Sequence, residues 1–241
     1  MATIQEHYNE VLSDVYSWMY GGFESNIQRY TDIFNKKKLS PQGSGIAIDL
    51  GAGCGFQSIP LAKAGYFVTA IDLDAKLLNE LKRNSADLEI KVLQGDLMGF
   101  DKDLDTKAEL VVCMTDTILH LDSRAKVISL FAKVFAALES GGKFIISFRD
   151  LTYELKEIER ILPVRSDEST IFTCFLEYEP ETVKVHDILY RKVNEEWKLS
   201  KSYYRKLRLS KAWVNEELSQ AGFSKTDLEV ENGLITITAS V

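Results

Sequence analysis

The chain has 241 residues, of which 45% are hydrophobic and 27% are charged, an ordinary composition for a globular protein with a sizeable core. The start, Met1 to Gln5, lacks the basic residues and apolar run of a secretion signal. No apolar stretch approaches the roughly 20 residues needed to span a bilayer. The cysteines, Cys54, Cys113 and Cys174, are far apart and lack metal-ligand spacing. We therefore expect a cytoplasmic protein with neither a membrane partner nor a bound metal.

The net charge of −7 argues against wholesale binding of phosphates, and so against nucleic acid as the partner. The segment from Lys184 to Lys211 departs from this balance, with nine Lys or Arg against three acidic residues. Such an excess is compatible with a nucleic-acid surface, with a solvated β-surface, or with a site for an anionic small molecule. The acidic character of the whole chain favours the last two.

The first part of the chain is predicted to be helical and the next to alternate short strands with helices. Apolar residues recur at helical spacing over residues 4–38, where Gly21 and Gly22 indicate two helices or a bend. A loop follows at 40–45. Strands are expected at 46–50, 67–71, 90–93, 110–114 and 143–148. Helices are expected up to Ala64, over 75–84 with Asp74 as N-cap, and from an Asp122 cap to Gly141-Gly142. This alternation predicts a parallel sheet covered on both faces.

The pattern changes after about Thr170. Long runs of alternating polar and apolar residues at 171–178, 182–193 and 197–209 predict an antiparallel meander. A helix is expected at 210–221, and then a pair of strands over 227–241 around the turn Asn232-Gly233.

A glycine-rich turn follows the first predicted strand. Asp49 lies at the strand end, and Gly51, Gly53 and Gly55 precede the next helix. In a doubly wound sheet this turn lies at the edge where ligands bind, glycines let the backbone approach a ligand closely, and the helix start offers unpaired N–H groups. Dinucleotide-binding proteins use such turns too. Here Phe56-Gln57 occupies the place of the third small residue of that pattern, which disfavours an NAD-dependent dehydrogenase.

Carboxylates after the first three strands indicate the ligand. Asp49 suits the cationic amino acid portion of a ligand better than a pyrophosphate. Asp72 follows the first glycine by about 20 residues and is placed to accept hydrogen bonds from two ribose hydroxyls. Asp96 would accept from an adenine amino group while Leu97 covers the ring.

With these motifs, residues 46–148 resemble the class I methyltransferases that use S-adenosylmethionine (SAM). Residues 49–55 look like their first motif and residues 70–74 like their second, and a carbonyl near Cys113 and Met114 falls where theirs meets the methionine ammonium. The resemblance implies SAM as cofactor, S-adenosylhomocysteine (SAH) as product, and an α/β, Rossmann-like, mostly parallel seven-stranded sheet. The cofactor-binding residues expected in this core are Asp49, Gly51, Gly53, Asp72, Leu73, Asp96, Leu97, Cys113 and Met114.

Polar residues follow the fourth and fifth predicted strands. Asp116 and His120 come after the fourth, and Arg149 and Tyr153 after the fifth. An arginine at this edge suits a carboxylate or phosphate because its donors bind in a bidentate fork. The alternative is a structural ion pair of Arg149 with Asp116 or Asp150.

These stretches, the aromatic segment 16–21 and the meander end 201–204 resemble glycine N-methyltransferase and related small-molecule N-methyltransferases. The resemblance implies that Arg149 holds the substrate carboxylate. The family has an amide residue where this chain has Asp116, so the acceptor need not be glycine. Tyr16 and Tyr20 are expected to fold over SAM, and Tyr153, Tyr204 and Asp116 to line the substrate pocket.

The resemblance also implies one domain over residues 1–241. A helical lid would occupy 1–42, the SAM-binding core 43–150, an antiparallel insertion that covers the substrate 165–210, and a return to the sheet 211–241. The chain is expected to be a monomer or a homodimer.

The expected function is methyl transfer to a small molecule, with the nitrogen of an amino acid or amine as the favoured acceptor. His120 is the first candidate for a proton acceptor, beside Asp116 and Arg149, because an imidazole titrates near neutrality. Alternatives are metal-assisted O-methylation through Asp116 and Asp150, and a SAM-binding regulator without catalysis. A further alternative is methylation of RNA or protein, for which the meander aromatics Tyr190, Trp197, Tyr203 and Tyr204 would form a stacking surface.

Overall fold

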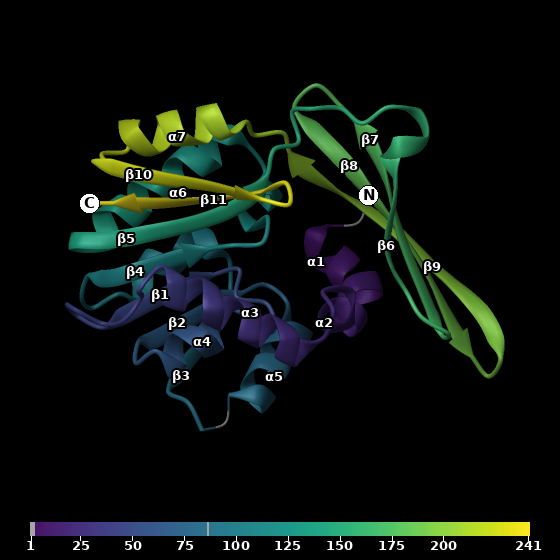
Figure 1. Cartoon of the computed structure of the whole chain (residues 1–241), viewed down its shortest axis with the longest axis horizontal. Helices are drawn as coiled ribbons and strands as arrows, with labels where there is room; N and C mark the ends of the chain where they lie inside the picture. The colour runs from purple at the N-terminus through teal and green to yellow at the C-terminus, as the bar shows by residue number, and fades with distance from the viewer. Residues whose placement is uncertain (1–2, 86) are drawn as a thin grey trace.

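The computed structural model describes residues 3–85 and 87–241. Its larger part is built on a seven-stranded sheet with the strand order β10-β11-β5-β4-β1-β2-β3 (Figure 1). Strands β1 to β5 are parallel, and β11 lies antiparallel between β5 and β10. The predicted mostly parallel, doubly wound sheet is confirmed. The strands are β1 (Ile46–Leu50), β2 (Phe67–Asp72), β3 (Ile90–Gln94), β4 (Ala108–Cys113), β5 (Leu138–Arg149), β10 (Lys225–Glu231) and β11 (Leu234–Ser240).

Helices cover both faces of this sheet (Figure 1). Helices α3 (Phe23–Lys36), α4 (Ser58–Lys63) and α5 (Ala75–Asn84) pack on one face, and α6 (Arg124–Ala137) and α7 (Lys211–Gln220) on the other. The 3-10 helices η3 (Leu97–Asp103) and η4 (Thr117–His120) follow β3 and β4, and η5 (Glu157–Arg160) follows β5. The longest described helices, α3 and α6, have 14 residues, and none of the described helices is long and apolar enough to cross a bilayer.

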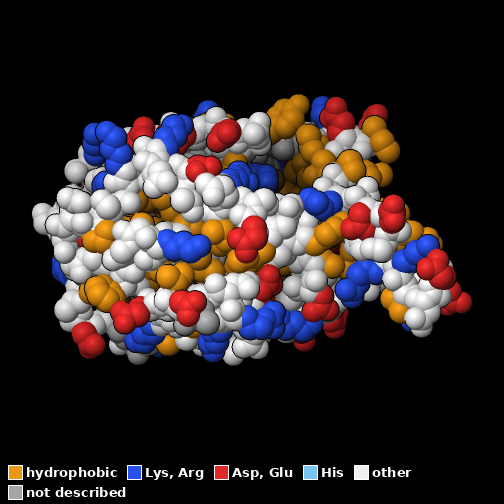
Figure 2. Space-filling view, turned by 60° about the horizontal axis from the view of Figure 1, so that its bottom comes forward, with side chains coloured by type: hydrophobic (Ala, Val, Ile, Leu, Met, Phe, Trp, Pro, Cys, Tyr) orange, Lys and Arg blue, Asp and Glu red, His pale blue; other side chains and the backbone are white. Residues whose placement is uncertain are grey.

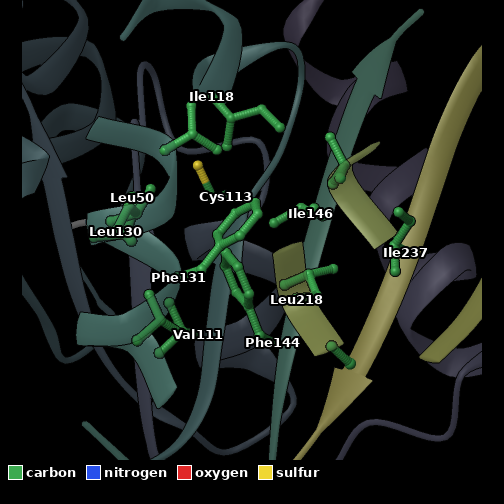
Figure 3. Close-up of a cluster of buried hydrophobic side chains, with 14 of the residues drawn as sticks. Leu50, Val111, Cys113, Ile118, Leu130, Phe131, Phe144, Ile146, Leu218 and Ile237 are labelled. Carbon is green, nitrogen blue, oxygen red and sulfur yellow. The ribbon is translucent and has the colours of Figure 1, made fainter. Parts of the chain in front are cut away.

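The main core lies between the sheet and the α6–α7 layer. Because side chains alternate along a strand, Val111 and Cys113 of β4 face this layer, while their neighbours Leu110 and Val112 face α3 and α4. Figure 3 shows Phe131 of α6 packed among these strand side chains, and the Cys113 sulfur within the same apolar cluster. The carboxyl ends of the parallel strands are thereby held in fixed register.

A second, four-stranded sheet contains the predicted meander and one further strand. Strands β6 (Ile161–Ser166), β7 (Thr170–Tyr178), β8 (Thr182–Val193) and β9 (Glu196–Leu207) pair antiparallel in that order. Its outer face keeps apolar cross-strand neighbours partly exposed, among them Ile171, Tyr190 and Leu199. Figure 2 shows hydrophobic side chains gathered over this end of the molecule.

The N-terminal segment lies between the two sheets (Figure 1). It consists of α1 (Ile4–His7), the π-helix η1 (Tyr8–Leu12), the 3-10 helix η2 (Ser13–Val15) and α2 (Tyr16–Met19). Its apolar residues pack on the inner face of the second sheet. The fully buried His7 places Nε2 2.8 Å from Oδ2 of Asp187 in β8. On the other side, the Ser13 hydroxyl donates to Asp74 at 2.8 Å.

Most predicted element boundaries are correct to within two residues, and three features differ. Ser123, not Asp122, caps α6, because its side chain accepts from the backbone N–H of Lys126. The helix ends at Ala137 instead of Gly141, because Leu138 already begins β5 and pairs with Ala108. Strand β6 was not predicted. It contains Pro163 and forms an edge of its sheet, where a missing N–H is tolerated.

Candidate active site

A cavity of about 570 Å³ lies at the carboxyl edge of the parallel strands, the position at which doubly wound sheets bind ligands. One wall comes from residues that directly follow β1, β2, β3 and β4. The opposite wall comes from the N-terminal segment and from β8 and β9. The predicted residues that line it are Tyr16, Gly51, Gly53, Asp72, Leu73, Asp96, Leu97, His120 and Tyr204.

The glycine-rich turn brings the backbone to the cavity wall. Gly51 has φ of +77°, and a Cβ there would lie 2.4 Å from Cγ2 of Thr117. Gly53 has φ of +52°, and its N–H donates to Oδ2 of Asp72 at 2.8 Å. A side chain at Gly51 would therefore collide with the η4 turn, while the Gly53 contact fixes the Asp72 carboxylate beside the turn.

The predicted nucleoside end of the cavity is lined with carboxylates. Oδ1 of Asp72 accepts from the N–H of Asp74 at 2.8 Å, and burial raises the pKa of Asp72 despite its backbone hydrogen bonds. Asp96 caps η3 by accepting from the N–H of Met98 at 2.9 Å, and Leu97 follows it on the wall. A carboxylate has capacity for further hydrogen bonds, so both groups can still accept from a ligand.

Asp49 is not on the cavity wall. It is buried beneath the glycine turn, where Oδ2 accepts from the Ser58 hydroxyl at 2.6 Å and Oδ1 has no hydrogen-bond partner among the described residues. Burial raises its pKa to about 7. The sequence placed Asp49 at the strand end correctly, but the side chain supports the turn from below instead of facing the cavity.

The turn after β4 has a strained backbone. Thr115 and Asp116 are consecutive residues with φ of +59° and +67°, which is costly for a β-branched residue such as threonine. The surroundings hold the turn in place. The Thr115 hydroxyl lies 2.9 Å from the Tyr30 hydroxyl and accepts from Gln57 at 3.1 Å, and the backbone N–H groups of Thr115 and Asp116 donate to Ser147. Such strain is common at functional sites, and here it fixes the direction of the Asp116 side chain.

Asp116 is buried and ion-paired with two cations. Its carboxylate accepts from the backbone N–H of Arg149 at 2.8 Å, from Nη1 of Arg149 at 2.7 Å and from Nζ of Lys206 at 2.8 Å. Burial alone would raise the pKa of Asp116, but the charges of Lys206 and Arg149 hold it well below its usual range. The cluster therefore carries a net charge of +1, so the carboxylate does not repel an anion. Arg149 remains 49% exposed.

The other end of the cavity is aromatic. The His120 ring stacks on Tyr204 at 5.3 Å between centroids and meets Tyr8 edge-on at 6.0 Å. Tyr8 also lies 6.2 Å from Tyr16. Burial, followed by the charge of Lys206, lowers the pKa of His120 to about 3, so its imidazole is neutral at physiological pH. A base this weak is a poor proton acceptor.

Several predicted residues lie outside the cavity wall. Tyr153 is 77% exposed and does not line the cavity, so its predicted place in the substrate pocket is not formed in this structure. Tyr20 packs behind Tyr16, at 5.1 Å between ring centroids. The side chains of Cys113 and Met114 are buried in the two cores on opposite faces of the sheet. Asp116 and Arg149 are also not among the residues that line the cavity.

Lys206 and Thr115 were not singled out from the sequence. Thr115 directly precedes Asp116, and no sequence pattern marks its left-handed backbone. Lys206 did have a signal, because it follows Tyr204 by two residues and therefore projects from the same face of β9. Its partner Asp116 is distant in the sequence, and no local pattern connects the two.

The proposed metal ligands have other partners. Asp116 is held by two cations, and Asp150 accepts from Thr152 and from the N–H of Lys211. Among the described residues, no group of three or more His, Cys, Asp or Glu is arranged to hold a metal ion.

The basic excess of residues 184–211 is partly compensated by ion pairs. Lys184 and Arg205 pair with Glu179, Lys206 with Asp116, and Arg208 with Glu154, with acidic partners outside the segment. On the face in Figure 2, basic and acidic side chains are interspersed.

Comparison with known proteins places these features in a family context. Residues 47–142 match the family model of the methyltransferase domain. A glycine/sarcosine N-methyltransferase of Aphanothece halophytica is 24% identical over 189 residues, which cover 78% of this chain and 69% of the relative. A SAM-dependent methyltransferase from Clostridium acetobutylicum superposes with a TM-score of 0.73 at 16% identity, covering 95% of each chain. The SAM-bound amino pentose methyltransferase CalS10 from Micromonospora echinaspora superposes with a TM-score of 0.72 at 14% identity, covering 94% of this chain and 95% of that one.

Proposed function

We propose that this chain, which carries a class I, SAM-dependent methyltransferase domain, methylates the nitrogen of a small molecule that also bears an anionic group. Bound SAM supplies an electrophilic methyl group on a positively charged sulfur. The protein must then hold a nucleophile in line with the departing sulfur, and such positioning is worth roughly 7–11 kcal/mol.

The two ends of the cavity support this assignment of ligands. Gly51, Gly53, Asp72 and Asp96 form the end that suits the amino acid and nucleoside portions of SAM. Tyr8, His120 and Tyr204 form the end left for the acceptor. A cavity that combines both is expected of an enzyme that joins SAM with a second small molecule.

The observation that carries the choice of nitrogen is the environment of His120. A hydroxyl acceptor needs a base to remove its proton during attack, whereas an amine needs only to bind as its neutral form. His120 is the titratable imidazole on the acceptor wall, and its pKa of about 3 makes it a weak base. We assign His120 to contact and orient the acceptor through hydrogen bonding and ring stacking.

The charge behind the acceptor end supports an anionic group on the acceptor. Arg149 uses Nη1 for Asp116, while its guanidinium carries five donors and is about half exposed. With Lys206 it leaves the cluster one positive charge in excess. The name of the glycine/sarcosine N-methyltransferase relative agrees with an acceptor that combines an amine and a carboxylate. A small-molecule acceptor also agrees with the partly compensated charge of the meander and with the net charge of −7 of the whole chain, which disfavour RNA.

Calorimetric titration with SAM, SAH and NAD tests the cofactor, with Asp72→Ala as the disabling variant and the exposed Asp227→Ala as its matched control. We expect micromolar binding of SAM and SAH, none of NAD, and weakened binding only in the Asp72 variant. If both variants still bind SAM and SAH as tightly as the wild type, the role assigned to Asp72 is wrong. Binding without turnover on any acceptor would indicate a regulator instead.

A methyl-transfer screen tests the acceptor. It compares amines with and without a carboxylate or phosphate, and hydroxyl compounds of similar size, by SAH release and product mass. We expect turnover of anionic amines. In Arg149→Ala, KM for the acceptor should rise about 10- to 100-fold, since a charged hydrogen bond contributes about 1.5–3 kcal/mol, while SAM affinity stays unchanged. Turnover confined to hydroxyl acceptors would refute N-methylation, and an equal loss of SAM affinity would refute the role of Arg149.

A further inference from the structure

Charged groups are distributed unevenly along the cavity. The carboxylates that line it are Asp72 at the end of β2, Asp74 just after it, Asp96 after β3, and Asp122 just before α6. Among the described lining residues, the aromatic end around Tyr8, His120 and Tyr204 contributes no carboxylate. A carboxylate at this end would favour the protonated, unreactive form of an acceptor amine, so its absence from the wall concerns the reaction directly.

A cation lies directly behind this aromatic end. Lys206 projects from the same face of β9 as Tyr204, with Nζ 5.9 Å from the Tyr204 ring centroid and 2.8 Å from Asp116. Its side chain is only 14% exposed. In such poorly hydrated surroundings a charge acts over several ångströms with little screening.

The pKa of His120 indicates how this end of the cavity affects a cation, because the protonated imidazole is positively charged like a protonated amine. Burial lowers the pKa of His120 most, Lys206 lowers it further, and Asp116 opposes them without reversing the shift. An ammonium group in the same place would be disfavoured for the same reasons. The titratable and charged groups facing His120 are His7, Tyr8, Asp116, Tyr204 and Lys206. At the same end the buried carboxylate of Asp187, which is paired with His7, acts on Tyr8 and Tyr204.

We propose that Lys206 is a positioning residue. Its charge favours binding of the acceptor amine in its neutral, nucleophilic form at the aromatic end of the cavity, so that methyl transfer needs no proton-accepting side chain. This inference rests on the proposed N-methylation. The amine gives up its proton to solvent as it binds. Its nitrogen lone pair then forms the new N–C bond, the electron pair of the broken C–S bond goes to sulfur, and the positive charge passes to the methylated nitrogen.

The acid limb of the pH dependence of kcat tests the proposal, because it reports ionisation in the enzyme–substrate complex. With the best amine from the acceptor screen, we expect Lys206→Met to move this limb to higher pH by about one unit. Asp116→Asn should move it to lower pH, because it leaves Lys206 and Arg149 unneutralised, and asparagine tolerates the left-handed backbone. Lys206→Arg should restore the wild-type profile. Lys201→Met, on the opposite, exposed face of β9, is the matched control.

Two measurements that do not depend on turnover complete the test. Calorimetry of the same amine binding to the enzyme–SAH complex, in buffers of different ionisation enthalpy, should show release of about one proton per amine bound below the amine's solution pKa. In NMR titration of the three histidines, His120 should stay neutral from pH 8 down to pH 5. Turnover with an unmoved acid limb, binding without proton release, or a His120 that titrates near pH 6.5 would overturn the role of Lys206. Absence of turnover on every amine, with His120 neutral as expected, would instead count against N-methylation itself.

Discussion

The hydroxyl of Ser13 donates a hydrogen bond to Oδ2 of Asp74 at 2.8 Å, while Oδ1 of Asp74 accepts from the N–H of Leu77 at the start of α5. The residue that caps a helix of the core therefore also anchors the N-terminal segment over the cavity. Both side chains are buried, so the contact is shielded from water.

Ser13→Ala should weaken the attachment of the N-terminal segment over the cavity. We expect a loss of about 1 kcal/mol of stability, the usual contribution of one hydrogen bond, and faster dissociation of SAH. Stopped-flow measurement of SAH release and urea unfolding check the two effects. Ser25→Ala is a suitable control, since the Ser25 hydroxyl donates to the local backbone carbonyls of Gly21 and Gly22 and not to the core. An unchanged release rate would show that this contact does not limit opening.

Gly51→Ala should impair both folding and cofactor binding. The new Cβ would lie 2.4 Å from Cγ2 of Thr117 at a backbone φ of +77°. Gly141→Ala is the matched control, because Gly141 has φ of +78° but open space around its Cβ position. The control isolates the backbone cost, about 1–2 kcal/mol, and the Gly51 variant adds a steric cost of about 1–3 kcal/mol. Equal unfolding free energies for the two variants would contradict the collision.

Asp49 should make the apo protein less stable as pH rises. Its folded pKa of about 7 lies above the unfolded value of 3.8, so the folded state binds more protons between these values. Stability should fall from about pH 4 to pH 7 and level off above. Asp49→Asn removes this dependence, so its stability relative to wild type should improve with pH. Urea unfolding at pH 5 and pH 8 measures the difference, and a constant difference would contradict the shift.

Asp116 should have the opposite dependence. Its pKa is lowered in the folded state, so its contribution to stability is present above the unfolded value of 3.8 and is lost as pH falls below it. Asp116→Asn should cost about 3–5 kcal/mol at pH 7, because two cations lose their buried partner. The cost should shrink in acid. Chemical unfolding at pH 7 and pH 3 checks this, and an equal cost at both values would refute it.

The cofactor end of the site could be predicted from the sequence because each of its residues lies next to the strand that positions it. Gly51, Gly53, Asp72, Asp96 and Leu97 each lie at the end of a strand or within three residues after it, and the predicted strands indicated where these ends would meet. The same reasoning placed Asp49 at the right edge but could not predict which way its side chain turns, because that depends on Ser58 across the turn.

The acceptor end was less predictable because its contacts join distant segments. Asp116 meets Lys206 only because the second sheet folds back over the first, and Tyr153 turns to solvent although it follows the strand that carries Arg149. The division into lid, core and insertion stays a prediction, as do the monomer or homodimer and the chemical roles assigned to His120 and Arg149.

The buried pair of His7 and Asp187 has a consequence for synthesis on the ribosome. His7 leaves the exit tunnel long before Asp187 is translated, so this pair cannot form until β8 has emerged. Strand β11, which fills the place between β5 and β10, is translated later still. The nascent chain therefore holds the glycine turn and its parallel strands before the cavity has its second wall, and the N-terminal segment can close over the cavity only after β8 has emerged.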